Sequence, residues 1–119
     1  MPTEPAPVTL AEVVRRAVEV CDPENADADL GDLLLRFEDA DEPVTAVEDL
    51  ERRLAGAEEA VDPELRNPAV SMAVAVALYL AHRRDEMDDD PADILRLAAR
   101  AEWRGDPPRV VVEWLAGQP

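Results

Sequence analysis

The chain has no lysine and little else from which a catalytic or cofactor site could be built. It has one cysteine, one serine and four glycines, and only 3% of its residues are aromatic. Without lysine no Schiff base can form, and with so few glycines there is no phosphate-binding loop. The single cysteine, Cys21, excludes an internal disulfide and fits a reducing compartment. We therefore expect a cytoplasmic, non-enzymatic protein without a cofactor.

The charge is strongly negative, because 28 acidic residues stand against 12 basic ones, for a formal net charge of −16. Charge of this size repels itself and is tolerated best where salt screens it. Adaptation to high salt is one explanation, and a GC-rich codon bias that favours arginine over lysine is the other. A surface of this sign disfavours direct binding to nucleic acid and to anionic membranes. We expect neither as a partner.

Length and composition predict one domain. Hydrophobic residues make up 47% of the 119 residues, which is enough for a buried core. Residues 1–8 carry three prolines, no basic residue and no apolar run, so we expect a flexible tail and no export signal. A single helical domain is predicted over residues 9–119.

Apolar residues recur at helical spacing along this domain, which predicts an all-α fold. Helices are predicted over about 10–21, 30–40, 45–60 and 91–104, and capping boxes at residues 9–12 and 45–48 mark two of the starts. Residues 107–116 fit either a helix or a strand. Five positions place Asp or Asn before proline, a pair that suits the start of a helix. These are residues 22, 62, 67, 90 and 106. No internal repeat is evident.

Residues 67–81 carry no charge at all. As a helix this segment spans roughly 22 Å, short of the ~30 Å of a bilayer core, so a membrane span is not expected. A helix that is apolar on every side must be enclosed by neighbours. The sequence therefore predicts a compact five- or six-helix bundle around a central apolar helix, about residues 67–86.

Two patterns suggest a metal site. Asp27, Asp29 and Glu38 have the spacing of three EF-hand ligands, but Gly31 falls one place early and one ligand is missing, so helix capping is the simpler explanation. His82, the only histidine, stands one turn before Glu86, and this pair can bind a metal. Two ligands do not make a zinc site, and a helix-end histidine near carboxylates explains the pair equally. A metal-dependent enzyme centred on His82 is the third hypothesis for function.

An arginine row is the feature with the least trivial explanation. Arg96, Arg100 and Arg104 recur every four residues and so share one face of a helix, and Arg109 lies just beyond. Acids of the same chain can pair with them, or the row can recognise an acidic partner or a second copy. Trp103 and Trp114 flank it, and tryptophan with arginine is common at interfaces. The predicted partner-binding residues are Arg96, Arg100, Trp103, Arg104, Arg109 and Trp114.

The leading hypothesis is a non-enzymatic protein-interaction or regulatory module adapted to high salt, with a protein partner or a second copy of itself. The alternative is an acidic mimic of nucleic acid, or an antitoxin-like protein, that binds a basic partner. Mimicry requires carboxylates gathered on one folded face, whereas salt adaptation spreads them evenly. In the sequence they are spread from residue 12 to residue 113, which favours adaptation.

Overall fold

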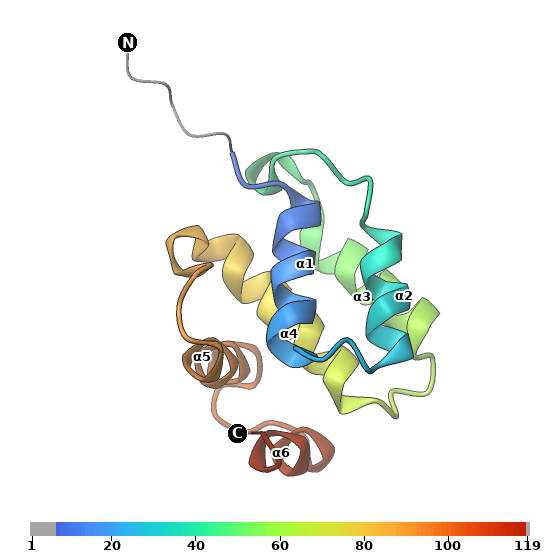
Figure 1. Cartoon of the computed structure of the whole chain (residues 1–119), viewed down its shortest axis with the longest axis vertical. Helices are drawn as coiled ribbons and strands as arrows, with labels where there is room; N and C mark the ends of the chain where they lie inside the picture. Colours follow the sequence, from blue (N-terminus) through green and yellow to red (C-terminus); the bar gives the residue numbers. More distant parts are fainter. Residues whose placement is uncertain (1–6, 119) are drawn as a thin grey trace.

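The computed structural model describes residues 7–118, and over these residues the chain is an all-α bundle, as predicted. Two short 3-10 turns, Val44–Ala46 and Arg84–Glu86, interrupt the helices, and no strand occurs within this range. The helices are α1 (Leu10–Cys21), α2 (Ala28–Arg36), α3 (Leu50–Val61), α4 (Pro68–His82), α5 (Pro91–Trp103) and α6 (Arg109–Ala116) (Figure 1).

The central helix of the bundle is α4. It packs against all five other helices of the described chain, and ten of its 15 residues are buried. Its start follows from the local sequence: Asn67 accepts a hydrogen bond from the backbone N–H of Ala69, and Pro68 occupies the first helical position. The predicted enclosure of the uncharged segment is confirmed. The helix ends at His82, however, and does not continue to residue 86.

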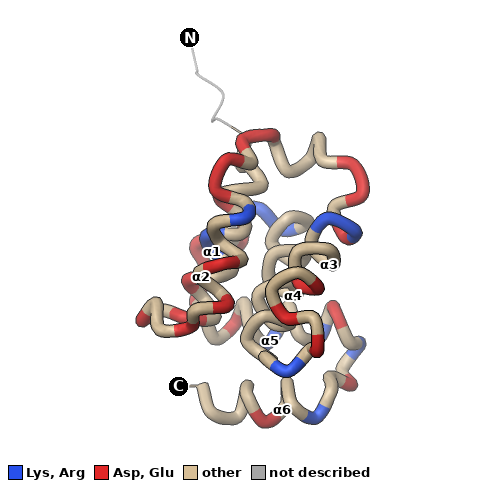
Figure 2. The backbone as a smooth tube through the Cα atoms, turned by 90° about the vertical axis from the view of Figure 1, so that its right-hand side faces the viewer, with Lys and Arg blue, Asp and Glu red and all other residues tan. Residues whose placement is uncertain are grey.

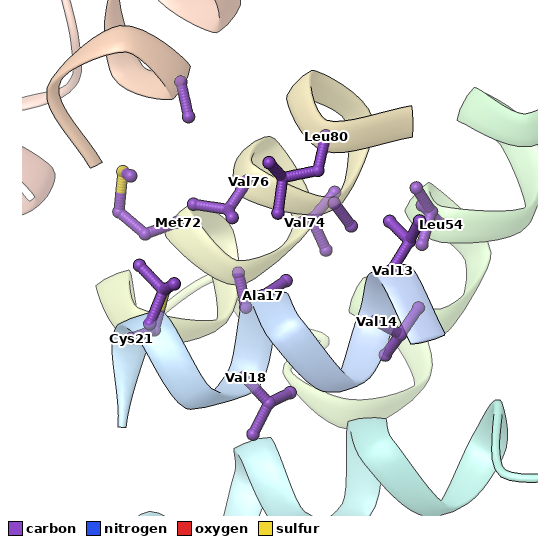
Figure 3. Close-up of a cluster of buried hydrophobic side chains, with 14 of the residues drawn as sticks. Val13, Val14, Ala17, Val18, Cys21, Leu54, Met72, Val74, Val76 and Leu80 are labelled. Carbon is purple, nitrogen blue, oxygen red and sulfur yellow. The ribbon is translucent and has the colours of Figure 1, made fainter. Parts of the chain in front are cut away.

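The core between α1 and α4 is built from small and medium apolar side chains. In Figure 3, Cys21 and Ala17 of α1 lie toward Met72 and Val76 of α4, and none of the four is more than 6% exposed. Val13, farther along α1, lies beside Leu54 of α3. Such side chains let the two helices pack at the density of a protein interior. Burial raises the pKa of the Cys21 thiol, which makes it an unreactive core residue.

The segment before α3 departs from the prediction. The capping box at residues 45–48 does not start a helix, because Val44–Ala46 forms a 3-10 turn and α3 begins only at Leu50. Tertiary pairing overrides the local signal: Val44 is buried, and its N–H donates to the carbonyl of Val8 at 2.9 Å. Val8 is therefore held in place, while residues 1–6 of the expected tail lie outside the described range.

Three further helices differ in extent or register from the prediction. α2 begins two residues earlier than expected and ends before Phe37. Helical spacing predicts that α5 buries Ile94, Leu97, Ala98 and Ala101. The helix is turned relative to this prediction, because Leu95 and Ala99 are buried with Ile94 and Ala98, whereas Ala101 is exposed. The ambiguous segment after residue 107 is helical and forms α6, with Val111 buried.

The loop between α1 and α2 and the loop between α3 and α4 have the same conformation. The chain therefore contains a short structural repeat, although no internal repeat was predicted from the sequence. Asp22 and Asp62 follow the two helices with closely similar φ and ψ, −145° and 68° against −137° and 69°. Three residues later, Asn25 and Leu65 adopt left-handed φ values of 55° and 52°. Each Asp accepts two backbone N–H groups of its loop, at 2.8–3.0 Å. These two Asp-Pro pairs therefore cap loops, and the helix-start prediction is wrong for Asp22 and Asp62. It is also wrong for Asp106, because α6 begins only at Arg109. It is right for Asn67, and Asp90 directly precedes α5 without a capping hydrogen bond from its side chain.

Candidate functional site

The predicted Arg–Trp surface is divided among several hollows around α5 and α6. Arg96 and Arg100 line one hollow together, whereas Trp103 and Trp114 each line a different one. Arg104 ends α5 in the left-handed conformation, with φ of 54°. No spacing along the chain predicts this division, because it depends on how α5 and α6 pack in three dimensions.

The hollow with the two arginines lies between α5 and α6, and we call it the α5–α6 groove. It has a volume of about 370 Å³. Arg96 and Arg100, one turn apart and both exposed, are the charged residues of its lining. Apolar residues from both helices and their connection form most of the rest: Ala92, Leu95, Ala99, Pro107 and Leu115.

Acids of the chain neutralise the arginine row only in part. Arg96 lies 3.4 Å from Asp93 and Arg109 lies 3.1 Å from Glu113, and both pairs are well exposed. Within residues 7–118, Arg100 and Arg104 make no ion pair. Exposed pairs of this kind contribute little to stability. At the groove, Arg100 is therefore unpaired among the described residues, and Arg96 makes only an exposed contact with Asp93.

Both tryptophans contribute to the packing of the fold. Each is half-buried and packs against the hydrophobic core. Trp114 lines a shallow hollow beside Cys21 and the loop 22–29, while Trp103 lines one beside Leu65 and Val110. Neither shares a hollow with the arginine row.

A second surface, which the sequence did not predict, runs along α4 between α3 and α5. Two hollows of about 310 and 330 Å³ adjoin there and share Glu102 in their linings; we call them together the α4 trough. Glu51 and Glu58 of α3 line it as well, and the Ser71 hydroxyl donates to Glu58 at 2.8 Å. Desolvation, with the charges of Glu51 and Glu58, raises the pKa of Glu102. The positions of Glu51 and Glu58, seven residues apart, indicate one helix face, but nothing in the sequence places Glu102 opposite them.

His82 is exposed at the end of α4, at the edge of a hollow of about 710 Å³ that Asp49, Glu51 and Arg84 also line. Its expected partner is engaged elsewhere, since the Tyr79 hydroxyl donates a hydrogen bond to the Glu86 carboxylate. Partial desolvation and this bond raise the pKa of Tyr79 to about 12. In the part of the chain that the structure describes, no three His, Cys, Asp or Glu side chains form a group that could hold a metal ion.

Helix capping explains the start of the EF-hand-like pattern. The Asp27 carboxylate accepts hydrogen bonds from the backbone N–H groups of Asp29 and Leu30, as expected for the residue before a helix. Glu38 lies beyond the end of α2 and is exposed. The explanation of Asp27 as a helix cap is confirmed.

Acidic residues lie on α1, α2, α3, α5 and α6, whereas α4 has none (Figure 2). No described helix has both the length and the apolarity needed to cross a membrane. The chain matched no protein-family model, no curated protein and no solved structure with which it was compared.

Proposed function

We propose that this chain is a non-enzymatic protein-interaction module that binds an acidic, amphipathic helix of a partner protein in the α5–α6 groove. The observation that carries the proposal is the composition of the groove: an apolar lining, with two exposed guanidinium groups one turn apart. Apolar hollows with a few placed polar groups are the usual form of a binding site.

The geometry favours a helical ligand with carboxylates on one side. Residues four apart on a helix lie about 6 Å from each other, so acids one turn apart on a partner helix match the spacing of Arg96 and Arg100. Guanidinium groups bind carboxylates through two parallel hydrogen bonds, which orients the ligand. The apolar face of the same helix then fills the groove beside Leu95 and Leu115.

High salt favours this pairing. A chain with a net charge of −16 repels an acidic partner at long range, and at 1 M salt the screening length falls to about 3 Å. Contacts made inside the groove are screened less than this long-range repulsion, and apolar burial keeps its strength. We infer that the chain works at high ionic strength, which the spread of carboxylates over five helices supports (Figure 2).

The same spread argues against mimicry of nucleic acid, which needs carboxylates concentrated on one face. The arginines of the groove also argue against mimicry of nucleic acid, because they would repel a basic partner. A carboxylate-bearing ligand is the better match.

Titration with an amphipathic helical peptide of leucine and glutamate tests the proposal by calorimetry at low and at molar KCl. We expect binding to strengthen with salt and to weaken roughly tenfold in Arg96→Glu/Arg100→Glu. Arg15→Glu/Arg66→Glu, which changes two exposed arginines elsewhere, is the matched control. Equal affinities for the two double variants would overturn the proposal. If light scattering finds a dimer for the wild type and a monomer for Arg96→Glu/Arg100→Glu, the groove binds a second copy of the chain instead.

A further inference from the structure

The α4 trough exists because α3 and α5 both pack on α4 without packing extensively on each other. Four residues of α4 at helical spacing line the trough: Ser71, Ala75, Leu78 and His82. Ala75 is buried, Ser71 and Leu78 are half-buried, and His82 is exposed. From Ser71 to His82 this row is about 16 Å long, or roughly three turns of helix. The trough is therefore long enough for a second helix to lie along α4.

One end of the trough is apolar and exposed. Among the described residues, four large hydrophobic side chains are strongly exposed, and two of them, Leu65 at 61% and Val110 at 49%, line this end together. Trp103 lies beside them. Exposed apolar side chains are unremarkable singly, but a cluster of them in a hollow marks a contact surface.

The walls carry an excess of negative charge. Glu51 and Glu58 stand on α3 and Glu102 on α5, while Arg83 and the His82 imidazole are the basic groups of the lining. Desolvation, and after it the charges of Glu51 and Glu58, raises the pKa of Glu102, so the three carboxylates repel one another across the trough. A cation brought between the walls would relieve this repulsion.

We propose that the α4 trough binds a cationic amphipathic helix of a protein partner. Its apolar face lies on Leu78 and Trp103 and reaches Leu65 and Val110, and its basic side chains meet the glutamates of the two walls. The charge of the walls selects this partner over an acidic helix and over nucleic acid, both of which they would repel. The site is separate from the α5–α6 groove and prefers a ligand of opposite sign.

Trp103 reports directly on the occupancy of the trough, because Trp114 lines another hollow. In Trp114→Phe, titration with an amphipathic leucine–lysine peptide of about three to four turns should shift the Trp103 emission to shorter wavelength. A scrambled peptide of the same composition should leave the emission unchanged. If Trp114→Phe folds poorly, calorimetry on the unaltered chain measures the affinities for the two peptides instead.

Two matched sets of variants separate docking from general attraction between opposite charges. Glu51→Gln/Glu58→Gln/Glu102→Gln should raise the Kd for the peptide roughly tenfold, whereas neutralising three exposed glutamates of α1, α2 and their loops should change it less than about twofold. The control changes are Glu19→Gln, Glu24→Gln and Glu38→Gln. Equal effects of the two triple variants would overturn the proposal.

The apolar contact is tested at molar KCl, where charge attraction is screened. Leu65→Ser/Val110→Ser should weaken binding several-fold there, and Leu35→Ser/Val112→Ser, which removes the other two exposed side chains, should not. Equal losses from the two pairs would also overturn the proposal. Self-association would overturn the proposal as well. In that case the mass of the chain without peptide would rise with concentration, Glu51→Gln/Glu58→Gln/Glu102→Gln would abolish the rise, and the occupant of the trough would be a second copy.

Discussion

The side-chain amide of Asn67 donates hydrogen bonds to both carboxylate oxygens of Asp27, at 3.3 and 3.1 Å. It also lies 3.1 Å from an oxygen of Asp29. The amide orientation follows from capping, since the carbonyl oxygen of Asn67 accepts the Ala69 N–H. A single side chain thus joins the starts of α2 and α4, where the two repeated loops meet.

Replacing this donor by an acceptor should destabilise the fold. Asn67→Asp keeps the helix cap but sets a third carboxylate against Asp27 and Asp29, and we expect a loss of about 1–3 kcal/mol in the free energy of unfolding at neutral pH. Repulsion raises the pKa of the new carboxylate in the folded state, so the loss is absent at low pH and grows as the pH rises through that pKa. Urea unfolding at several pH values measures it. Asn67→Ser, which keeps the cap and adds no charge, should lose less; equal losses would show that the negative charge is not the cause.

The repeated loops should differ in their sensitivity to loss of the capping aspartate. Asp62 is 7% exposed and satisfies the N–H groups of Arg66 and Asn67, so Asp62→Ala leaves two donors unpaired and should cost about 1–3 kcal/mol. Asp22 is less deeply buried, and water can replace its carboxylate. Asp22→Ala should therefore cost less, with Asp62→Asn between the two. Chemical denaturation compares them, and a larger loss at Asp22 would contradict this ranking.

The single tyrosine gives a direct test of the contact at the end of α4. Tyr79 should ionise near pH 12 in the folded chain, against a usual pKa near 10, and the tyrosinate absorbance band records the midpoint. The pKa is raised in the folded state, so the stabilisation is complete below pH 10 and is lost between pH 10 and 12. Glu86→Gln should lower the midpoint toward 10. A midpoint near 10 in the folded wild type would contradict the contact.

Thermal stability should rise with salt. Carboxylate repulsion is screened as KCl goes from low to molar concentration, so Tm should increase, and a flat or falling Tm would contradict adaptation to high salt. Glu102→Gln removes one member of the repulsive group with Glu51 and Glu58. It should raise stability at low salt by about 0.5 kcal/mol or less, and the gain should shrink in molar KCl, where the repulsion is screened but the desolvation is not. Glu38→Gln is the control at an exposed position outside the trough.

Features that depend on local sequence were predictable, and features that depend on the meeting of distant segments were not. The uncharged segment of α4 could only be enclosed, and the structure encloses it. The capping box at residues 45–48 failed because Val44 is paired with Val8, thirty-six residues before it. The trough requires Glu102 to face α3, which no spacing along the chain reveals.

The repeated loops could have been found from the sequence. Asp-Pro-Glu occurs at residues 22–24 and again at 62–64, and a capping residue follows each at the same offset, Asp27 and Asn67. Each copy on its own is typical of the start of a helix, because Asp before Pro suits a helix cap. The shared left-handed residue, three after each aspartate, is what distinguishes a loop from a helix start, and its two side chains, Asn25 and Leu65, have nothing in common.

The short helix α6 borders both proposed binding surfaces: Leu115 lines the α5–α6 groove, and Val110 and Val111 line the trough. Of its eight residues only Val111 is fully buried, while Trp114 and Leu115 are half-buried against the core. One short helix therefore contributes side chains to both surfaces, so a substitution in α6 can alter the two proposed ligand preferences together.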